Sequence, residues 1–321
     1  MPELLNRIVV AIDGSEGSTL AVEAASELAV GTDSELHLVH VCPTPPLPAV
    51  ERVDQPGPMA DAFTREIEEE ARELLRQQAW HAEVAGATVA EKHLRVGRPA
   101  EEISTLAEEV GCGLVVVGGR RMGALKRLVS GSVSRNVARK ASRPVLVVRG
   151  GWPPSHVVVG DDLSEEAGRA GELAAIIGGL YESPVGLATA YQPGNWYIEY
   201  AAHCRHVRET ERRIRQELRG RAAVLGRTLE EAPHSEVAPR RPDDTLREAS
   251  KGGKATLVAV GRRDLGAARR AITGGVSDGV LEAADGPVLV VPASTKGSQD
   301  RDRRPTSRYV GANEKAGGYP R

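Results

Sequence analysis

The pentapeptide PVLVV occupies residues 144–148 and occurs again at residues 287–291. A second match lies near the start of each half, where RIVVAIDGSEGS at 7–18 resembles HVVVGDDLSEEA at 156–167. The two copies of each match are separated by about the length of a domain, which indicates that a whole domain is present twice. A chain of 321 residues is long enough for two domains of roughly 100–200 residues each.

We therefore predict a first domain over residues 1–150 and a second domain over residues 151–292. The remaining residues, 293–321, contain seven basic and three acidic residues and are rich in Gly, Ser, Arg and Pro. They have no apolar period, so we expect a disordered tail.

The first half alternates apolar, β-branched runs with amphipathic stretches. The run at 7–12 has no polar alternation, which is typical of a strand buried on both faces. The predicted strands of this half cover 7–12, 36–41, 89–96, 114–117 and 145–148. The predicted helices begin after Ser15 or Ser18 and, further along, cover 59–84, 99–109 and 132–141.

The second half repeats this order. Its predicted strands cover 157–160, 185–191, 257–260 and 288–291, and a helix carries Val207, Ile214, Leu218 and Leu225. Strands that alternate with helices imply a parallel sheet with right-handed crossovers. The predicted fold class is α/β, with two tandem doubly wound, Rossmann-like domains that each contain an open five-stranded parallel sheet.

The last strand of each half, 145–148 or 288–291, is an edge of such a sheet. A bare apolar edge invites aggregation, so we expect the two edges to pair within the chain. The oligomeric state, including a homodimer, stays open at this point.

The composition excludes several classes of partner. Aromatic residues make up 3% of the chain, so stacking surfaces for single-stranded nucleic acid are scarce. The net charge of −2 implies no polyanion partner. No window approaches 18 consecutive apolar residues, and the first seven residues do not resemble a secretory signal. We therefore expect a cytoplasmic protein that uses neither a membrane nor nucleic acid.

Metal and disulfide sites find little support in the sequence. The three cysteines form no Cys-x-x-Cys pair. His203 and His206 are spaced to meet one metal on a predicted helix, but no third ligand is evident nearby. No metal site is predicted.

Ligands of open parallel sheets bind beyond the carboxyl ends of the strands. In the first half, three loops lie at such ends: Asp13-Gly14-Ser15, the residues after Val41, and a glycine-containing loop from Gly118 to the helix that starts at Ser132. Glycines let an anion approach the backbone, and amides at a helix start point toward it. The third loop is therefore a candidate phosphate site, although its glycines could equally serve tight turns.

Charge favours the same loop. No acidic residue occurs between Glu109 and Asp161, and the stretch holds nine basic residues. We interpret it as a focused positive field, with a solvated surface as the alternative. The nine basic residues are Arg120, Arg121, Lys126, Arg127, Arg135, Arg139, Lys140, Arg143 and Arg149.

The order of a strand, a G-x2-G-x9-G-S/T loop, a helix and PVLVV resembles the universal stress proteins, over both halves of the chain. In nucleotide-binding members of that family, this loop holds the phosphates of ATP. The resemblance places the first glycine at Gly118 and the last pair at Gly131-Ser132, the ribose contact at Asp13 and the adenine contact at Val41. The nucleotide-binding residues implied are Ala11, Ile12, Asp13, Val41, Val117, Gly118, Arg120, Arg121, Gly131, Ser132, Val133 and Ser134.

The sequence departs from the family pattern in the glycine-containing loop of each half. Arg121 replaces the middle glycine of the first half, where its side chain could either block the pocket or hold a phosphate. In the second half, Asp264 replaces the middle glycine, and Gly275 follows Gly274 in place of the final Ser/Thr. The resemblance therefore implies an ATP site in the first domain, with Mg²⁺ left open, and a degenerate site in the second.

The implied function is regulatory: an ATP-binding stress-response protein whose second domain is a scaffold. Catalysis finds less support, because the chain has neither a GxSxG elbow nor a GxxxxGK[ST] loop. We therefore predict that it is not an enzyme. Two alternatives stay open, an interaction protein that binds no nucleotide and a slow ATPase.

Overall fold

The computed structural model describes residues 5–43, 58–119, 132–190, 200–229, 231–238, 244–246, 248, 255–263 and 276–293. Several residues singled out above lie outside these ranges. They are Arg120, Arg121, Lys126, Arg127, Gly131, Asp264, Gly274, Gly275 and the tail beyond residue 293.

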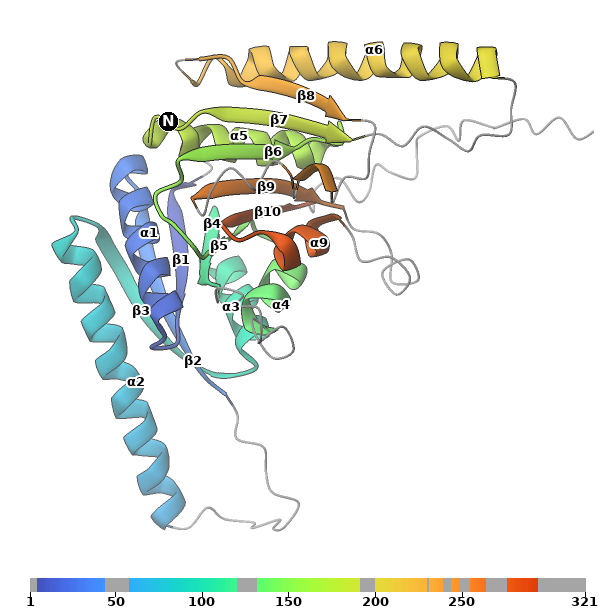
Figure 1. Cartoon of the computed structure of the whole chain (residues 1–321). Helices are drawn as coiled ribbons and strands as arrows, with labels where there is room; N and C mark the ends of the chain where they lie inside the picture. The colour runs from blue at the N-terminus through green and yellow to red at the C-terminus, as the bar shows by residue number, and fades with distance from the viewer. Residues whose placement is uncertain are drawn as a thin grey trace, which may run out of the picture.

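All described strands join one sheet, in the order β3-β2-β1-β4-β5-β10-β9-β6-β7-β8 (Figure 1). The strands are β1 (Arg7–Ile12), β2 (Glu35–Pro43), β3 (Thr88–Gly97), β4 (Leu114–Gly118), β5 (Val145–Val148), β6 (His156–Gly160), β7 (Val185–Ala190), β8 (His234–Ala238), β9 (Thr256–Arg262) and β10 (Val288–Pro292). The helices are α1 (Glu16–Thr32), α2 (Pro58–Val84), α3 (Pro99–Glu109), α4 (Ser132–Lys140), α5 (Glu165–Leu180), α6 (Tyr200–Leu225) and α9 (Val276–Ala283).

The predicted elements of the first half all form, each within two residues of its predicted ends. In the second half the structure adds β8, a strand that the sequence pattern did not reveal. Only the last two residues of β8 are buried, and β8 lies at the edge of the sheet, so it lacks the long apolar run that marks the inner strands.

Each half contributes five parallel strands, but the two halves do not form separate open sheets. β5 and β10 pair in antiparallel fashion, with Leu146 opposite Leu289 and Val145 opposite Val290. Each half keeps its predicted five parallel strands, and the expected pairing of their edges joins them into one continuous sheet of ten strands. The edge strands of the two halves cover each other's backbone groups, which is the physical reason for this arrangement.

Helices cover both faces of the sheet. One face carries a core that includes Leu28 of α1, Leu75 of α2 and Leu173 of α5. The other carries a core that includes Ile103 of α3 and Val280 of α9. Inner strands covered on both sides require apolar residues at nearly every position, which accounts for the Val, Leu and Ile runs in the sequence.

Side chains also join the two halves beside the paired strands. The guanidinium of Arg262, on β9, donates to the carbonyl oxygens of Ala138 at 2.5 Å and Ala141 at 2.7 Å, where α4 ends. Carbonyls at a helix end lack partners within the helix, so the second half caps a helix of the first. On the other face, Trp152 Nε1 and Tyr181 OH both donate to Glu27 Oε2 at 3.0 Å.

Backbone amide exchange tests the pairing of the halves in solution. We expect slow exchange at Leu146 and Val147, and at Leu289 and Val290, in the intact chain. Exchange should be faster at both sites when each half is expressed alone, because the unpaired edge then faces water. Equal protection in a monomeric single half would show that the two strands do not shield each other.

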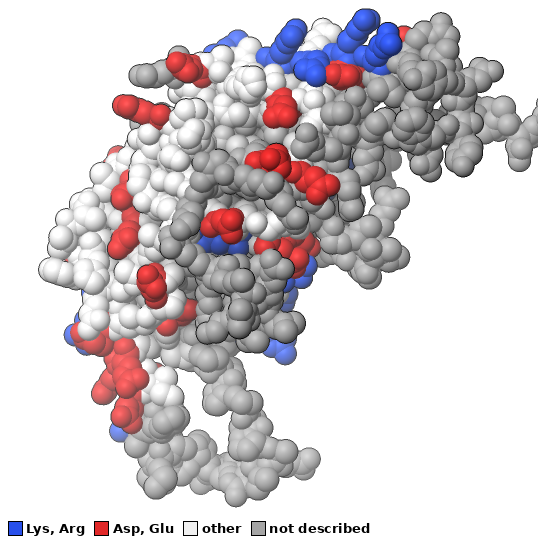
Figure 2. Space-filling model, viewed as in Figure 1, with Lys and Arg blue, Asp and Glu red and all other residues white. Residues whose placement is uncertain are grey.

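The two long helices at the ends of the sheet carry opposite charge. Residues 65–84 of α2 include six glutamates and three arginines, whereas residues 208–225 of α6 include six arginines and three glutamates. Figure 2 shows acidic side chains over α2 and basic side chains along α6. Among the described residues, no helix has the length and apolar character needed to cross a membrane.

Candidate functional site

A cavity of about 110 Å³ lies at the carboxyl ends of the first-half strands. The ends of β1, β2 and β4 form its floor, and α3 and α4 supply the sides. This is where an open parallel sheet places its ligands. The lining residues are Ala11, Ile12, Asp13, Ser18, Val39, Val41, Pro99, Ile103, Val117, Gly118, Val133 and Ser134.

Eight of the twelve predicted site residues line this cavity. They are Ala11, Ile12, Asp13, Val41, Val117, Gly118, Val133 and Ser134. Ser132 begins α4, and its side chain lies outside the described residues, as do Arg120, Arg121 and Gly131. The structure therefore brings together every predicted site residue whose side chain or glycine backbone it describes.

Four lining residues escaped the sequence analysis. Val39 could have been found from Val41, because alternate residues of a strand point to the same face. Ser18 lies in the first turn of α1, and Pro99 and Ile103 lie on α3. Whether these three residues line the cavity depends on how the helices pack over the strand ends, which no local sequence pattern predicts.

Asp13 combines a structural role with its place in the cavity. Its Oδ1 accepts hydrogen bonds from the Ser15 backbone amide at 3.0 Å and from the Ser15 hydroxyl at 2.5 Å. Ser15 in turn caps α1 by accepting from the Ser18 amide at 3.2 Å. The carboxylate is thereby held in one orientation at the cavity mouth, a useful property for a group that contacts a ligand.

Gly118 is a glycine because β4 approaches α1 very closely. A Cβ atom at this position would lie 2.4 Å from the backbone carbon and oxygen of Gly17 and 2.7 Å from the Ser18 nitrogen. The access that Gly118 would give a phosphate is therefore not the sole explanation for a glycine at this position. Packing of strand against helix alone demands a glycine here.

The basic stretch 120–149 is not an open positive field in the described part of the first half. Arg135 lies 3.0 Å from the carboxylate of Glu282, and Arg139 binds Asp278 in a two-pronged ion pair at 2.7 and 2.9 Å. Both carboxylates belong to α9 of the second half. These charges therefore join the two halves.

Two further basic residues of the stretch have protein partners. Lys140 lies 3.0 Å from the Glu101 carboxylate, and Arg149 donates to the Gly286 carbonyl at 3.1 Å. Burial lowers the pKa of Arg149 to about 10. Four of the five basic residues that the structure describes in this stretch thus have protein partners, and the fifth is Arg143.

A second cavity, of about 160 Å³, occupies the equivalent place in the second half. Gly160, Val260 and Ser277 lie where the first half has Ala11, Val117 and Ser134. The full lining is Gly160, Asp161, Asp162, Ala188, Ala190, Thr245, Leu246, Val260, Gly261, Arg263, Val276 and Ser277.

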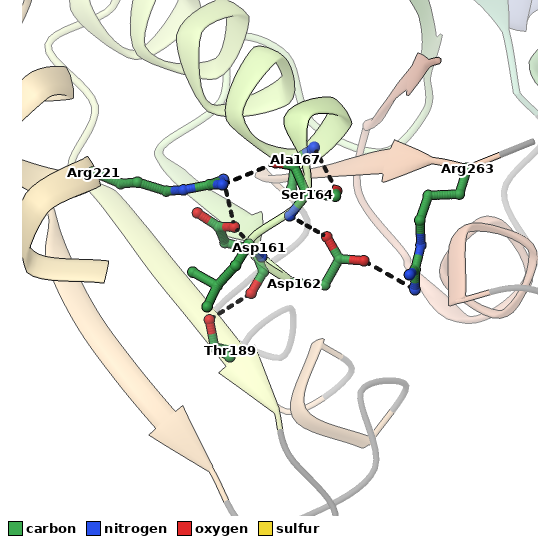
Figure 3. Close-up of polar contacts among 8 residues, drawn as sticks. Asp161, Asp162, Ser164, Ala167, Thr189, Arg221 and Arg263 are labelled. Atoms are coloured by element: carbon green, nitrogen blue, oxygen red, sulfur yellow. Dashed lines mark hydrogen bonds and ion pairs between the residues drawn. The ribbon is translucent and has the colours of Figure 1, made fainter. Parts of the chain in front are cut away.

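The second cavity differs from the first most sharply at Asp161, which stands where the first half has Ile12. Asp161 is buried, and its Oδ1 lies 2.8 Å from Nη1 of Arg221 on α6 (Figure 3). The same guanidinium donates through Nη2 to the Ser164 carbonyl at 3.0 Å. Burial raises the pKa of Asp161, and the neighbouring Arg221 charge opposes that rise.

Asp162, the counterpart of Asp13, is also engaged within the protein. Its Oδ1 accepts from the Ser164 amide at 3.1 Å, and its Oδ2 lies 3.1 Å from Nη2 of Arg263. Figure 3 shows Arg263 reaching from the end of β9 to this carboxylate. Arg263, a cation that lines the second cavity, is therefore already paired with an acidic side chain.

Comparison with known proteins agrees with the duplicated pattern. The model of the universal stress protein family matches residues 5–149 and again residues 154–292. Universal stress protein YxiE of Bacillus subtilis is 36% identical over 151 residues, which cover 46% of this chain and 100% of YxiE. Universal stress protein MJ0531 of Methanocaldococcus jannaschii is 31% identical over 147 residues, which cover 46% of this chain and 83% of MJ0531.

A solved structure shows the same fold over nearly the whole chain. The crystal structure of a universal stress protein from Archaeoglobus fulgidus superposes with a TM-score of 0.67 at 21% sequence identity. It covers 89% of this chain and 98% of the archaeal chain. With a family match in each half and a common fold throughout, this chain belongs to the universal stress protein family and contains two copies of the family's domain.

Proposed function

We propose that the first domain binds an adenine nucleotide, with ATP as the expected ligand, and that the protein acts as a nucleotide-dependent regulator in the stress response. The observation that carries the proposal is the first-half cavity, which gathers eight predicted site residues at the carboxyl ends of three parallel strands.

The lining of this cavity suits a purine base better than a charged group. Val39, Val41 and Ile103 provide apolar contacts, and Asp13 is the one carboxylate among the described lining residues. A ribose hydroxyl could donate to the Asp13 carboxylate at the mouth. The phosphates would then extend toward the start of α4, where backbone amides favour an anion.

The second domain is proposed as a scaffold. Its cavity contains two aspartates, Asp161 and Asp162, and each is already paired with an arginine of the same domain. Arg263 is paired with Asp162. The same domain supplies the acidic partners of α4 across the paired halves, so its structural contribution to the first domain is direct.

Binding is proposed in preference to catalysis. Asp13 is the one carboxylate among the described lining residues of the first cavity, and its Oδ1 already accepts two hydrogen bonds from Ser15, which suits it to holding a ligand more than to transferring a proton. ATP turnover by the purified protein would favour the slow ATPase instead. Absence of any ATP binding would favour an interaction protein.

A matched pair of substitutions tests which cavity is used. Val41 lies near the end of β2 and lines the first cavity, and Ala190 occupies the equivalent place on β7 and lines the second cavity. Val41→Trp should weaken ATP binding roughly 10-fold or more, because overfilling a packed site costs about 1–3 kcal/mol. Ala190→Trp should leave the affinity unchanged.

Calorimetric titration of the full chain with ATP measures both affinities, and thermal unfolding confirms that both variants are folded. The proposal is contradicted if the Ala190 variant loses ATP binding while the Val41 variant keeps it. It is also contradicted if neither change has any effect on binding.

A further inference from the structure

Away from the nucleotide cavity, two histidines and a glutamate meet on the outermost strands of the first half. They are His37 on β2 and Glu91 and His93 on β3. One ligand atom from each residue lies within 4.8 Å of the others. Nitrogen and carboxylate ligands in this combination are those that zinc takes in three-ligand sites with an open position.

A β-bulge creates the cluster. In the β2–β3 pairing, Leu36 lies opposite Val89, but His37 lies opposite Glu91, so one residue of β3 is skipped between them. Glu91 and His93 are two residues apart and share a face of the strand. Without the bulge, His37 would face Ala90, and the two β3 side chains would be displaced from it.

The distances suit a common metal ion. His37 Nδ1 lies 3.1 Å from His93 Nε2, and His93 Nε2 lies 3.7 Å from Glu91 Oε2. Two nitrogens bound to one tetrahedral zinc at 2.0–2.1 Å stand roughly 3.3 Å apart. The two ring nitrogens are therefore already at the separation that a shared ion requires, and the carboxylate needs only a small side-chain adjustment.

Two of the three ligand side chains are largely buried and the third is exposed, which gives a metal ion access to the site. His37 is 8% exposed, and the His93 side chain is 10% exposed. Glu91 is exposed, with 63% of its side chain accessible, so the third ligand opens toward water. The rings are held by the sheet, and the carboxylate can swing onto an ion as it arrives.

The protonation state also suits metal binding. Burial lowers the pKa of both His37 and His93, while Glu91 acts in the opposite direction. Neutral imidazoles are the form that binds metals. In the metal-free chain, one ring donates to the other. On binding, that hydrogen shifts to the far nitrogen of its own ring, and both facing nitrogens present lone pairs.

We propose that His37, Glu91 and His93 form a binding site for a divalent first-row transition metal, with zinc as the expected ion. The fourth position is left to water. The site is independent of the proposed nucleotide cavity, because none of its three residues lines that cavity.

Zinc titration of the untagged full chain by calorimetry tests the proposal. We expect one zinc per chain, and a rise in the unfolding temperature with zinc concentration. Glu91→Gln should weaken zinc binding at least 10-fold. The variant should remain folded, because Glu91 is exposed. His93→Ala should weaken binding roughly 100-fold or more, since loss of a direct ligand exceeds the 10- to 100-fold typical of outer-sphere changes.

The matched control is the double variant His203→Ala/His206→Ala, which removes two histidines that are three residues apart on α6. It should bind zinc as the wild type does. The proposal is overturned if the wild type shows no saturable binding. It is equally overturned if Glu91→Gln and His93→Ala both retain wild-type affinity, or if the control variant is the one that loses the ion.

Discussion

Replacing Arg221 with alanine is expected to lower the free energy of unfolding by about 3 kcal/mol, the cost of leaving a buried charge without its partner. The side chain of Asp161 is 2% exposed, and Arg221 provides its ion pair. The value is taken at the lower end of the usual range because Arg221 is itself 28% exposed. Chemical denaturation of the variant and of the wild type measures the difference.

The pH dependence of this loss identifies Asp161 as its source. Burial raises the pKa of Asp161 in the folded state, and removal of Arg221 should raise it further. The folded variant then binds a proton more tightly than the unfolded chain, so its stability falls as the pH rises through that pKa. The deficit relative to wild type should therefore shrink as the pH is lowered toward the usual aspartate pKa.

Arg219 provides the matched control for this experiment. It lies on the same helix as Arg221 and is exposed. Arg219→Ala should change stability by less than about 0.5 kcal/mol. A similar loss in both variants, or a deficit for Arg221→Ala that does not change with pH, would contradict the assignment.

Gly118→Ala is expected to destabilise the protein by about 3 kcal/mol, the upper end of the cost of overpacking. The added methyl group would meet backbone atoms of Gly17 at 2.4 Å. Backbone atoms in the first turn of a helix cannot rotate away as a side-chain end can. The change should be visible as a lower denaturation midpoint with an unchanged slope.

Gly220→Ala is the control for this effect of a methyl group. Gly220 lies in α6, and an added Cβ would meet no atom within 4 Å. The substitution should be neutral or stabilise the protein by up to about 1 kcal/mol, because alanine favours a helix. Wild-type stability of the Gly118 variant would show that β4 and α1 can separate at little cost.

The inner strands could be predicted from sequence because their physical cause is local. A strand covered on both faces must be apolar throughout, and the runs at 7–12 and 145–148 satisfy that condition. β8 could not be predicted in the same way, since it is an edge strand with exposed polar residues. The pairing of β5 with β10 followed from the need to cover two apolar edges.

The site was predictable where strand ends define it and unpredictable where distant segments meet. Val41 and Val117 follow directly from the ends of their strands, whereas Ile103 reaches the cavity through helix packing. The charge count of the basic stretch could not reveal that Asp278, from the other half, pairs with Arg139. The histidine cluster depends on a bulge, and a single skipped residue in a strand pairing leaves no mark on a sequence pattern.

The covalent link between the halves gives the paired edge strands, β5 and β10, a property that two separate subunits lack. Joined domains have an effective concentration in the millimolar range for short linkers, so dilution does not separate them. Two identical subunits must carry the same residue at both sites. In the joined chain, Ile12 at the end of β1 and Asp161 directly after β6 occupy equivalent positions of the two halves. One site can therefore diverge freely while the other keeps its chemistry.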